Sequence, residues 1–294
     1  MKSKSVLIIG GSGFIGSHLA LRLVKDFKVF STFLNHPFYI PGVSSIPLDV
    51  TDRNSIKRVI YATQPEVIIY CAGKNSIDTY EANPKDAEII HTNGVVNVST
   101  CAEILQPKFI LISNCFVFDG KKGNYKETDI TVPPSALGKT KIGGENFLKG
   151  KSLNYIIVRS SPLFGRGNYH HHSFLDRLRI SLHKKALIEF SDVETHSFAP
   201  IYGLAHLIER IIVGEVKNEI FHYGGLTKTS YFDFAKRFCN SFNLDGNLIV
   251  KARDIQNGYS DYSLNSSLIY QKLNINPLVM KEGFDLIQNH LIVA

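Results

Sequence analysis

The sequence predicts an α/β protein: a doubly wound parallel sheet in residues 1–165, and a smaller substrate lobe in residues 166–294 that is interleaved with the last sheet strands. Short apolar runs alternate with helical stretches through the first half, a glycine-rich turn follows the first run, and this rhythm breaks after Arg159. Strands that are apolar throughout are typical of sheets covered by helices on both faces.

Each expected strand is a short apolar run bounded by turn residues or by a helix. The expected strands are Val6–Ile9, Lys28–Phe33, Val67–Cys71, Phe109–Ser113, Tyr155–Arg159, Glu219–Tyr223 and Leu248–Val250. The helices between them carry apolar residues three or four positions apart, as Ile15, Leu19 and Leu23 illustrate. These helices are Phe14–Lys25, Arg53–Thr63, Asp86–Leu105, Lys139–Leu148, Ser173–Lys184, Leu204–Val213 and Phe232–Phe242, with two short helices near the end.

Composition excludes several classes of protein. Hydrophobic residues make up 44% and charged residues 20% of the 294 positions, which are ordinary values for a globular chain and exclude disordered and fibrous proteins. No apolar run approaches the roughly 20 residues that span a bilayer, so no membrane association is expected. The first apolar run is interrupted at Gly10 and lacks a small-residue cleavage pattern, so we expect a cytoplasmic protein.

The cysteines and the charge distribution indicate which classes of ligand the protein binds. The four cysteines form no C-x-x-C pair and show no metal-ligand spacing, which favours reduced core thiols over a disulfide or zinc site, and no metal is expected. The net charge of +7 is spread over small pairs such as Lys57-Arg58, without a basic stripe or interleaved aromatic residues. Nucleic acid is therefore not an expected partner, whereas a mild positive charge suits an anionic small ligand.

The first expected strand runs directly into a glycine-rich segment and then into a helix. Such a turn lets the backbone approach a pyrophosphate, which the free amides and dipole of the helix N-terminus then bind. The alternative is a structural turn without a ligand. The favoured interpretation is a dinucleotide site, and its residues are Gly10, Ser12, Gly13, Phe14, Ile15 and Gly16.

The end of the second strand bears on the choice between NAD and NADP. An acidic residue about 20 positions after the glycines would bind the ribose hydroxyls of NAD. Thr32–His36 contains no acidic residue, but Thr32 and Asn35 offer groups that accommodate a 2′-phosphate. NADP is therefore favoured, with NAD as the alternative, and a loop that does not discriminate between them stays open.

Two further turns are candidates for cofactor contact. Asp49 and Val50 follow a short apolar segment, and the Asp49 carboxylate is placed to accept the adenine amino group; Asp52 suits the helix cap better. Cys71, Ala72 and Gly73 end a strand with small residues, which lets the backbone approach a cofactor. The alternative is an ordinary turn at each place.

With these motifs in order, the chain resembles the extended short-chain dehydrogenases, and among them the dTDP-4-dehydrorhamnose reductase-like branch of the NAD-dependent epimerase/dehydratase superfamily. The resemblance implies a Rossmann-type sheet, a C-terminal sugar-nucleotide lobe, and NAD(P)H-dependent chemistry at a nucleotide-sugar carbonyl or hydroxyl. It rests on Gly10–Gly16, Asp49–Asp52, Cys71–Gly73, Asn93, Phe116–Gly120, Tyr125–Glu127, Gly138–Lys141, Gly144-Glu145 and Arg159, and more loosely on Phe164-Gly165, Pro200, Leu204-Ala205 and Asp261–Leu264.

The resemblance also implies catalytic residues, and here the chain departs from the pattern. The family uses a tyrosine as general acid, and a lysine four residues later that lowers the pKa of the phenol and binds the nicotinamide ribose. Lys141 is present, but Leu137 stands at the tyrosine position. Ser113 is retained, and Asn114 stands where the family carries threonine. The residues expected to transfer the proton are therefore altered. General acid catalysis contributes about 10²–10⁴-fold to the rate of a reaction.

Other side chains are candidates for the missing proton donor. His170 begins a run of three histidines, and imidazole titrates near neutral pH; an exposed polar loop, a substrate phosphate contact and a metal ligand are the alternatives for this run. Tyr80 and Tyr169 are further candidates that also suit packing roles. Arg166 is a candidate ligand of the substrate diphosphate, and Arg159 suits a structural role.

Two functions remain open from the sequence. The first is an NAD(P)-dependent nucleotide-sugar reductase-like enzyme with an altered proton donor. The second is a catalytically silent, NADP-binding regulatory or scaffold subunit, which the replacement at Leu137 and Asn114 favours. A nucleotide sugar is the expected substrate, and a homo-oligomer is compatible with either function.

Overall fold

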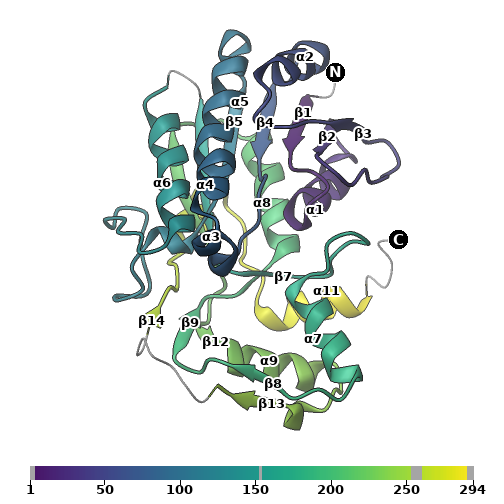
Figure 1. Cartoon of the computed structure of the whole chain (residues 1–294), viewed down its shortest axis with the longest axis vertical. Helices are drawn as coiled ribbons and strands as arrows, with labels where there is room; N and C mark the ends of the chain where they lie inside the picture. Colours follow the sequence, from purple (N-terminus) through teal and green to yellow (C-terminus); the bar gives the residue numbers. More distant parts are fainter. Residues whose placement is uncertain (1–3, 152–153, 253–259, 290–294) are drawn as a thin grey trace. The chain divides into compact units, whose positions relative to one another are not determined.

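The computed structural model describes residues 4–151, 154–252 and 260–289 of the chain, and these fall into two compact units (Figure 1). The first unit contains the residues up to Phe118, Ile130–Arg159 and Ala205–Phe221. The second contains Asp119–Asp129, Ser160–Leu204 and the residues from His222 onward. The two units therefore interleave along the sequence.

A seven-stranded sheet forms the centre of the first unit, in the order β11-β6-β5-β4-β1-β2-β3. The pairs β1–β2, β2–β3, β1–β4 and β4–β5 are parallel. The chain runs from β1 outward to the edge at β3 and returns to β4 beside β1, so the carboxyl ends of β1 and β4 form a topological switch point. The strands are β1 (Ser5–Ile9), β2 (Lys28–Phe33), β3 (Ser44–Pro47), β4 (Val67–Tyr70), β5 (Lys108–Asn114), β6 (Tyr155–Ser160) and β11 (Glu219–Tyr223).

Helices cover both faces of this sheet. Leu7 and Ile9 of β1 share a buried cluster with residues of α2, α5 and α6, whereas Val6 and Ile8 point to the opposite face because strand side chains alternate. On that opposite face the Arg22 guanidinium of α1 pairs with Glu209 of α8 at 2.6 Å. The helical segments are α1 (Phe14–Leu23), α2 (Arg53–Thr63), α3 (Ile77–Ala82), α4 (Pro84–Ala87), η1 (Glu88–Asn93), α5 (Gly94–Ala102), η2 (Glu103–Leu105), η3 (Cys115–Val117), α6 (Ala136–Lys149) and α8 (Ile201–Val213).

The second unit is built of short strands and helices around aromatic side chains. Phe198 stacks on Phe234 with ring centroids 4.2 Å apart, and Phe164 and Phe284 pack beside this pair. Its elements are β7 (Leu163–Phe164), α7 (Phe174–His183), β8 (Ile188–Phe190), β9 (Glu194–His196), β10 (Ala199–Pro200), β12 (Thr229–Ser230), α9 (Tyr231–Ser241), η4 (Gly246–Leu248), β13 (Ile249–Lys251), β14 (Ser260–Asp261), α10 (Ser267–Leu273) and α11 (Met280–Asn289).

The expected elements are confirmed for most of the first unit, including β2 and α2 with the same bounds. The single helix expected over Asp86–Leu105 is corrected: the segment comprises α4, the π turn η1, α5 and the 3₁₀ turn η2. The π turn lies where α6 packs most closely, since a Cβ on Gly143 or Gly144 would press on this segment. This close packing is a long-range contact that local sequence spacing does not encode.

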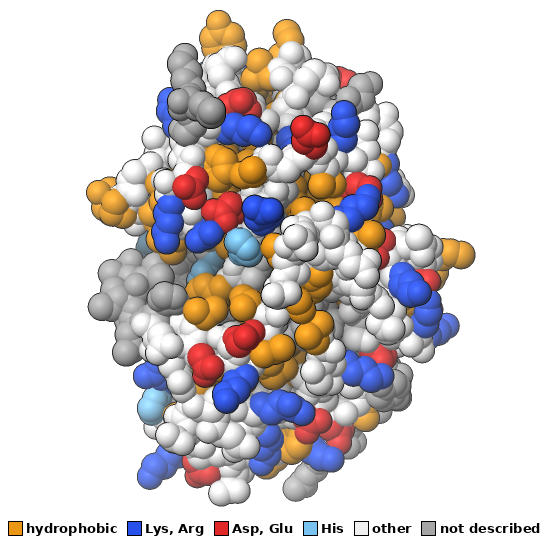
Figure 2. All heavy atoms as spheres, turned by 180° about the vertical axis from the view of Figure 1, so that it is seen from behind, with side chains coloured by type: hydrophobic (Ala, Val, Ile, Leu, Met, Phe, Trp, Pro, Cys, Tyr) orange, Lys and Arg blue, Asp and Glu red, His pale blue; other side chains and the backbone are white. Residues whose placement is uncertain are grey.

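The described residues were searched for membrane-spanning helices, metal-binding groups of side chains and disulfides. None of their helices is both long and apolar enough to cross a membrane. Within the same ranges no three His, Cys, Asp or Glu side chains are grouped to hold a metal ion, and the four cysteines form no disulfide. On the face shown in Figure 2, basic and acidic side chains are interspersed and form no single basic stripe.

Candidate functional site

The glycine loop joins β1 to α1, and three of its glycines, Gly10, Gly13 and Gly16, have different surroundings. Gly10 has φ +83°, and a Cβ there would lie 2.6 Å from the Cα of Ala72. A Cβ on Gly16 would clash with the carbonyl oxygen of Gly10, so α1 packs directly on the loop. A Cβ on Gly13 would meet only the Gly10 oxygen, at 3.3 Å. Gly10 and Gly16 are therefore required by the fold, whereas Gly13 borders open space.

The N-terminus of α1 fits an anionic group. Gly13 is the N-cap, has no side chain to accept the first amides, and is followed by a turn without acidic residues. The N–H groups of Phe14 and Ile15 have no partner within the helix because they belong to its first turn. The helix dipole adds positive potential at this end. The loop therefore fits the pyrophosphate of a dinucleotide.

The end of β2 supports this loop and borders it. The buried Thr32 hydroxyl accepts a hydrogen bond from the Gly10 N–H at 3.1 Å, and the Thr32 carbonyl accepts one from the Ser12 N–H at 3.3 Å. Thr32 thus holds the loop in shape. Asn35 and His36 are exposed, and no acidic side chain follows the strand.

The two aspartates after β3 have different roles. The Asp52 carboxylate accepts the Asn54 N–H at 2.9 Å and caps α2, as the sequence predicts. Asp49 accepts both the N–H and the hydroxyl of Thr51 at 2.8 Å, which fixes its carboxylate in the turn. The carbonyl oxygen of Val50 accepts a hydrogen bond from Asn97 of α5. Contact of Asp49 or Val50 with adenine stays a prediction.

The residues after β4 approach the loop closely. The Cys71 thiol lies 3.3 Å from the carbonyl oxygen of Ile9, and burial raises its pKa to about 12, so the thiol is protonated at neutral pH. Ala72 contacts the loop at Gly10. Gly73 has φ +99°, and a Cβ there would clash with the His91 ring. Small residues are therefore required here by the packing of the loop and of η1.

His91 is a member of this site that the sequence analysis did not single out. Its ring is 2% exposed, and the Tyr80 ring packs edge-on against it with the ring centroids 5.1 Å apart. Burial and the Lys141 charge hold its pKa well below the usual value, so the ring is neutral. A lone histidine in a helical stretch carries no sequence signal of burial. Asn93, expected to contact the cofactor, is exposed at the end of the same turn.

Helix α6 carries the residues at the tyrosine and lysine positions of the family. Ser135 caps the helix by accepting the Gly138 N–H, and Leu137 and Lys141 follow one turn apart. Leu137 is fully buried, and Lys141 is 8% exposed with its Nζ donating to the Ile112 carbonyl at 3.2 Å. Burial lowers the pKa of Lys141 to about 8, and Cys71 and Glu145 partly oppose the shift. The structure thus brings the lysine into the site without a phenol beside it.

Ser113 and Asn114 end β5 next to Ile112, and both are 2% exposed. The Asn114 oxygen accepts the Phe116 N–H at 3.0 Å, and its amide nitrogen donates to the Asn75 oxygen at 2.6 Å. Asn75 was not anticipated, although it follows Gly73 by two residues. The side chain at the family's threonine position is therefore held by two contacts within the first unit.

The remaining candidates are placed as follows. Tyr80 is buried, and its hydroxyl oxygen accepts the Lys74 N–H at 3.0 Å. Arg166, Tyr169 and His170 belong to the second unit: Arg166 is partly buried, Tyr169 is 90% exposed, and the exposed His170 packs edge-on against Tyr169. Their contact with a substrate stays a prediction.

Arg159, assigned a structural role from the sequence, lies within the first unit and away from solvent. Its guanidinium forms an ion pair with Glu145 at 2.7 Å, with side chains only 3% and 0% exposed. The guanidinium carbon also lies 5.4 Å from the centroid of the Phe118 ring. These contacts join β6 to α6, so Arg159 supports the helix that carries Lys141.

Comparison with known proteins agrees with this geometry. The chain is 32% identical over 235 residues to the dTDP-4-dehydrorhamnose reductase of Aggregatibacter actinomycetemcomitans, covering 78% of this chain and 76% of that one. It is 25% identical to methionine adenosyltransferase 2 subunit beta of Bos taurus, over 82% and 73% of the two chains. The dTDP-4-dehydrorhamnose reductase of Bacillus anthracis, solved with NADP, superposes with a TM-score of 0.86 at 21% identity and covers 99% of this chain and 100% of that one. The family model described as the RmlD substrate binding domain matches residues 4–273, and the chain therefore belongs to that family.

Proposed function

We propose that the first unit binds NADP(H) and that the protein acts on a nucleotide sugar as a reductase-like member of its family. The observation that carries the proposal is the open N-terminus of α1 behind Gly13, beside the small residues that end β4. Support comes from the relative named dTDP-4-dehydrorhamnose reductase and from the structural neighbour solved with NADP. A cytoplasmic location is part of the same proposal and can be tested by fractionation of the source cells.

When bound, a nicotinamide dinucleotide supplies the hydride. In the proposal, the amides of Phe14 and Ile15 bind its pyrophosphate, and Asp49 accepts from its adenine amino group. Lys141 donates from its ammonium to the hydroxyls of the nicotinamide ribose, since an ammonium carries three donors and the Ile112 carbonyl takes one. Asn114 keeps one amide hydrogen beyond its bond to Asn75, which suits a substrate carbonyl oxygen.

The proton that accompanies hydride transfer has no donor at residue 137. Leu137 is apolar and fully buried. The Lys141 ammonium is charged at neutral pH with a pKa of about 8 and is proposed to bind ribose. Arg166 and His170 of the second unit are proposed to bind the substrate diphosphate, with His170 also a candidate acid. The proposal therefore includes slow turnover, because general acid catalysis is weakened.

A second candidate function rests on the same substitution. A site that keeps the cofactor loop and Lys141 but buries a leucine at the acid position also suits a protein that binds NADP without turnover. The similar protein of Bos taurus is named methionine adenosyltransferase 2 subunit beta, that is, a subunit of another enzyme. In this alternative the protein is a cofactor-dependent regulatory or scaffold subunit.

One pair of measurements separates the two functions. NADPH oxidation is followed with dTDP-4-dehydro sugars, alongside isolation of partners from the source with and without NADPH. Turnover that is lost in Lys141→Met supports the reductase. Tight NADPH binding without turnover, together with a partner retained only when NADPH is present, supports the subunit. Failure to bind either dinucleotide contradicts both.

A further inference from the structure

The carboxamide of Asn114, at the end of β5, has a fixed orientation. Its oxygen accepts the Phe116 N–H at 3.0 Å, and its nitrogen donates to the side-chain oxygen of Asn75 at 2.6 Å. A backbone N–H can only donate, so the Asn114 oxygen must face Phe116 and the nitrogen must face Asn75. The carboxamide therefore cannot turn over without losing both hydrogen bonds.

One amide hydrogen of Asn114 is left after these two bonds. A carboxamide nitrogen carries two hydrogens, and among the residues that the structure describes Asn75 is its only acceptor. Asn114 is 2% exposed, so the remaining hydrogen is largely shielded from bulk water. Buried donors are normally satisfied, and this one therefore indicates a ligand at the end of β5.

Asn75 lies between β4 and α3, and hydrogen bonds fix the chain on both sides of it. On one side the Lys74 N–H donates to the hydroxyl oxygen of the buried Tyr80 at 3.0 Å. On the other side Ser76 caps α3, since its hydroxyl accepts the Thr79 N–H at 3.3 Å. Asn75 is thus an exposed residue on a fixed segment, and its side chain holds a buried one.

A cation lies at the same end of β5. The Lys141 ammonium donates to the carbonyl oxygen of Ile112 at 3.2 Å, and Ile112 precedes Asn114 by two residues. Two residues of a strand span roughly 7 Å. An ammonium and an oriented amide N–H both stabilise negative charge on an oxygen atom, and such donors act most strongly where water is excluded.

We propose that Asn75 is a positioning residue, which holds the Asn114 carboxamide so that its second N–H donates to the carbonyl oxygen of the sugar. The inference rests on the proposed function and states how the reacting carbonyl is held there. Negative charge develops on this oxygen when a hydride is added to the neighbouring carbon. A donor that is already oriented toward the oxygen needs no reorganisation at that moment. Asn75 therefore acts through Asn114, without touching the reacting atoms.

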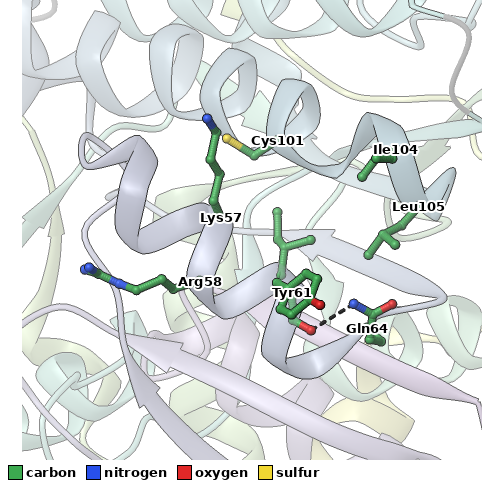
Figure 3. Close-up of a pocket in the computed structure, with 8 residues that line it drawn as sticks. Lys57, Arg58, Tyr61, Gln64, Cys101, Ile104 and Leu105 are labelled. Carbon is green, nitrogen blue, oxygen red and sulfur yellow. Dashed lines mark hydrogen bonds between the residues drawn. The ribbon is translucent and has the colours of Figure 1, made fainter.

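A surface of the first unit outside this site supplies the control. Figure 3 shows a hollow of about 430 Å³ that is lined by residues from α2 with its C-cap Gln64, from α5 and from η2. No residue of α3, β5 or α6 lines it. Helix α2 also carries Asn54, which is exposed in its first turn. Asn54→Leu therefore makes the same change as Asn75→Leu away from Asn114.

Calorimetric titration of the full chain with saturating NADP⁺ tests the inference without turnover. The ligands are a dTDP-4-dehydro sugar and dTDP, which lacks the sugar carbonyl. Asn75→Leu keeps the size of the side chain but removes the acceptor, so it should weaken binding of the sugar at least about fivefold. Its affinity for dTDP should stay within about twofold of wild type, and Asn54→Leu should change neither affinity. A wild type that binds neither ligand contradicts the proposed function and the inference together. Binding of both ligands that Asn75→Leu weakens equally, or leaves unchanged, overturns the inference alone.

The variant Asn114→Thr tests whether Asn75 acts through Asn114. A threonine hydroxyl can accept the Phe116 N–H as a cap, and it donates its own hydrogen to a carbonyl oxygen without help from Asn75. In the Asn114→Thr background, Asn75→Leu should therefore change the affinity for the dTDP-4-dehydro sugar by less than about twofold. Melting temperatures of the four proteins check that they fold. An equal loss of affinity in both backgrounds would overturn the positioning role of Asn75.

Discussion

Leu137 and Lys141 lie one turn apart on α6, both are buried, and only the lysine carries a polar group at its tip. The Lys141 ammonium donates to the carbonyl oxygen of Ile112, at the end of β5. A leucine at residue 137 offers neither a proton nor an acceptor to this charge. In the proposed function the substitution at residue 137 therefore affects proton transfer, and cofactor binding can be tested separately.

NADPH should bind at least about fivefold more tightly than NADH. The reason is that Thr32–His36 contains no carboxylate to repel a 2′-phosphate or to bind the ribose hydroxyls of NAD. Calorimetric titration with both cofactors measures the ratio. Asn35→Asp should reverse it, because Asn35 is exposed at this turn and the new charge repels phosphate. If wild type and Asn35→Asp each bound NADPH and NADH with equal affinity, Asn35 would not contact the cofactor.

Gly13→Val should abolish dinucleotide binding while the protein stays folded. A Cβ at Gly13 meets only the Gly10 oxygen at 3.3 Å, so the fold tolerates it, but the branched side chain holds a pyrophosphate away from the amides. Gly10→Ala is the contrasting variant: at φ +83° with Ala72 2.6 Å away, it should lower the melting temperature. Normal titration curves for Gly13→Val would make the loop purely structural.

The ion pair between Arg159 and Glu145 should stabilise the first unit only as a pair. Removing one partner with Glu145→Leu or Arg159→Met should cost about 3–5 kcal/mol, because an uncompensated charge stays buried. The double variant should lose much less, since both charges leave together. Urea denaturation of all four proteins completes the cycle. A loss in the double variant equal to the sum of the two single losses would show that the two residues do not interact.

Much of the first unit follows from local pattern, and the rest depends on distant contacts. Residues close together in the sequence are enough to predict three features: the i, i+4 spacing of Leu137 and Lys141, the Asp52 cap and the Gly10 turn. The start of α6 at Ala136 was missed by three residues, although the Ser135 cap that fixes it can be read from the sequence.

The second unit was less predictable for a physical reason. Strands such as β10 and β12 contain two residues each, which is too short for a pattern, and they form because a distant strand pairs with them. The burial of His91 likewise depends on Gly73 and Tyr80. These short strands and the burial of His91 depend on residues that are distant in the sequence, so no hydrophobic periodicity predicts them.

Lys141 should make the stability of the protein depend on pH. Its pKa is about 8 in the folded protein and 10.5 ordinarily, so the unfolded chain binds more protons between these values and the free energy of unfolding rises with pH there. The cost of burying the charge is fully present below about pH 8 and disappears above about pH 10.5. It amounts to roughly 3 kcal/mol at most.

Urea denaturation of wild type and Lys141→Met at about pH 7 and pH 10 measures this effect. The variant should gain relative stability at the lower pH and lose that advantage at the higher one, because only wild type titrates at residue 141. Other groups contribute equally to both proteins and cancel. A difference between the two proteins that does not change with pH would mean that Lys141 keeps an ordinary pKa.

Leu137→Tyr should raise turnover of dTDP-4-dehydro sugars measurably above a weak or absent wild-type rate. The substitution places a phenol one turn from the Lys141 ammonium, which favours the phenolate and lowers the pKa of the new hydroxyl. A buried phenol also needs a hydrogen-bond partner, and Lys141 and Ser113 are the candidates. Partial rescue is the expected ceiling, because Asn114 is bonded to Asn75 and lacks a hydroxyl.

The matched control is Leu137→Phe, which adds the same ring without the proton. It should leave turnover unchanged, and a comparison of melting temperatures corrects for overpacking at a fully buried position. Single-turnover oxidation of NADPH, measured across pH in both variants, separates the acid from the ring. A rate raised equally by tyrosine and phenylalanine would rule out the acid role of residue 137. A robust wild-type rate that collapses in His170→Ala would instead assign proton transfer to the second unit.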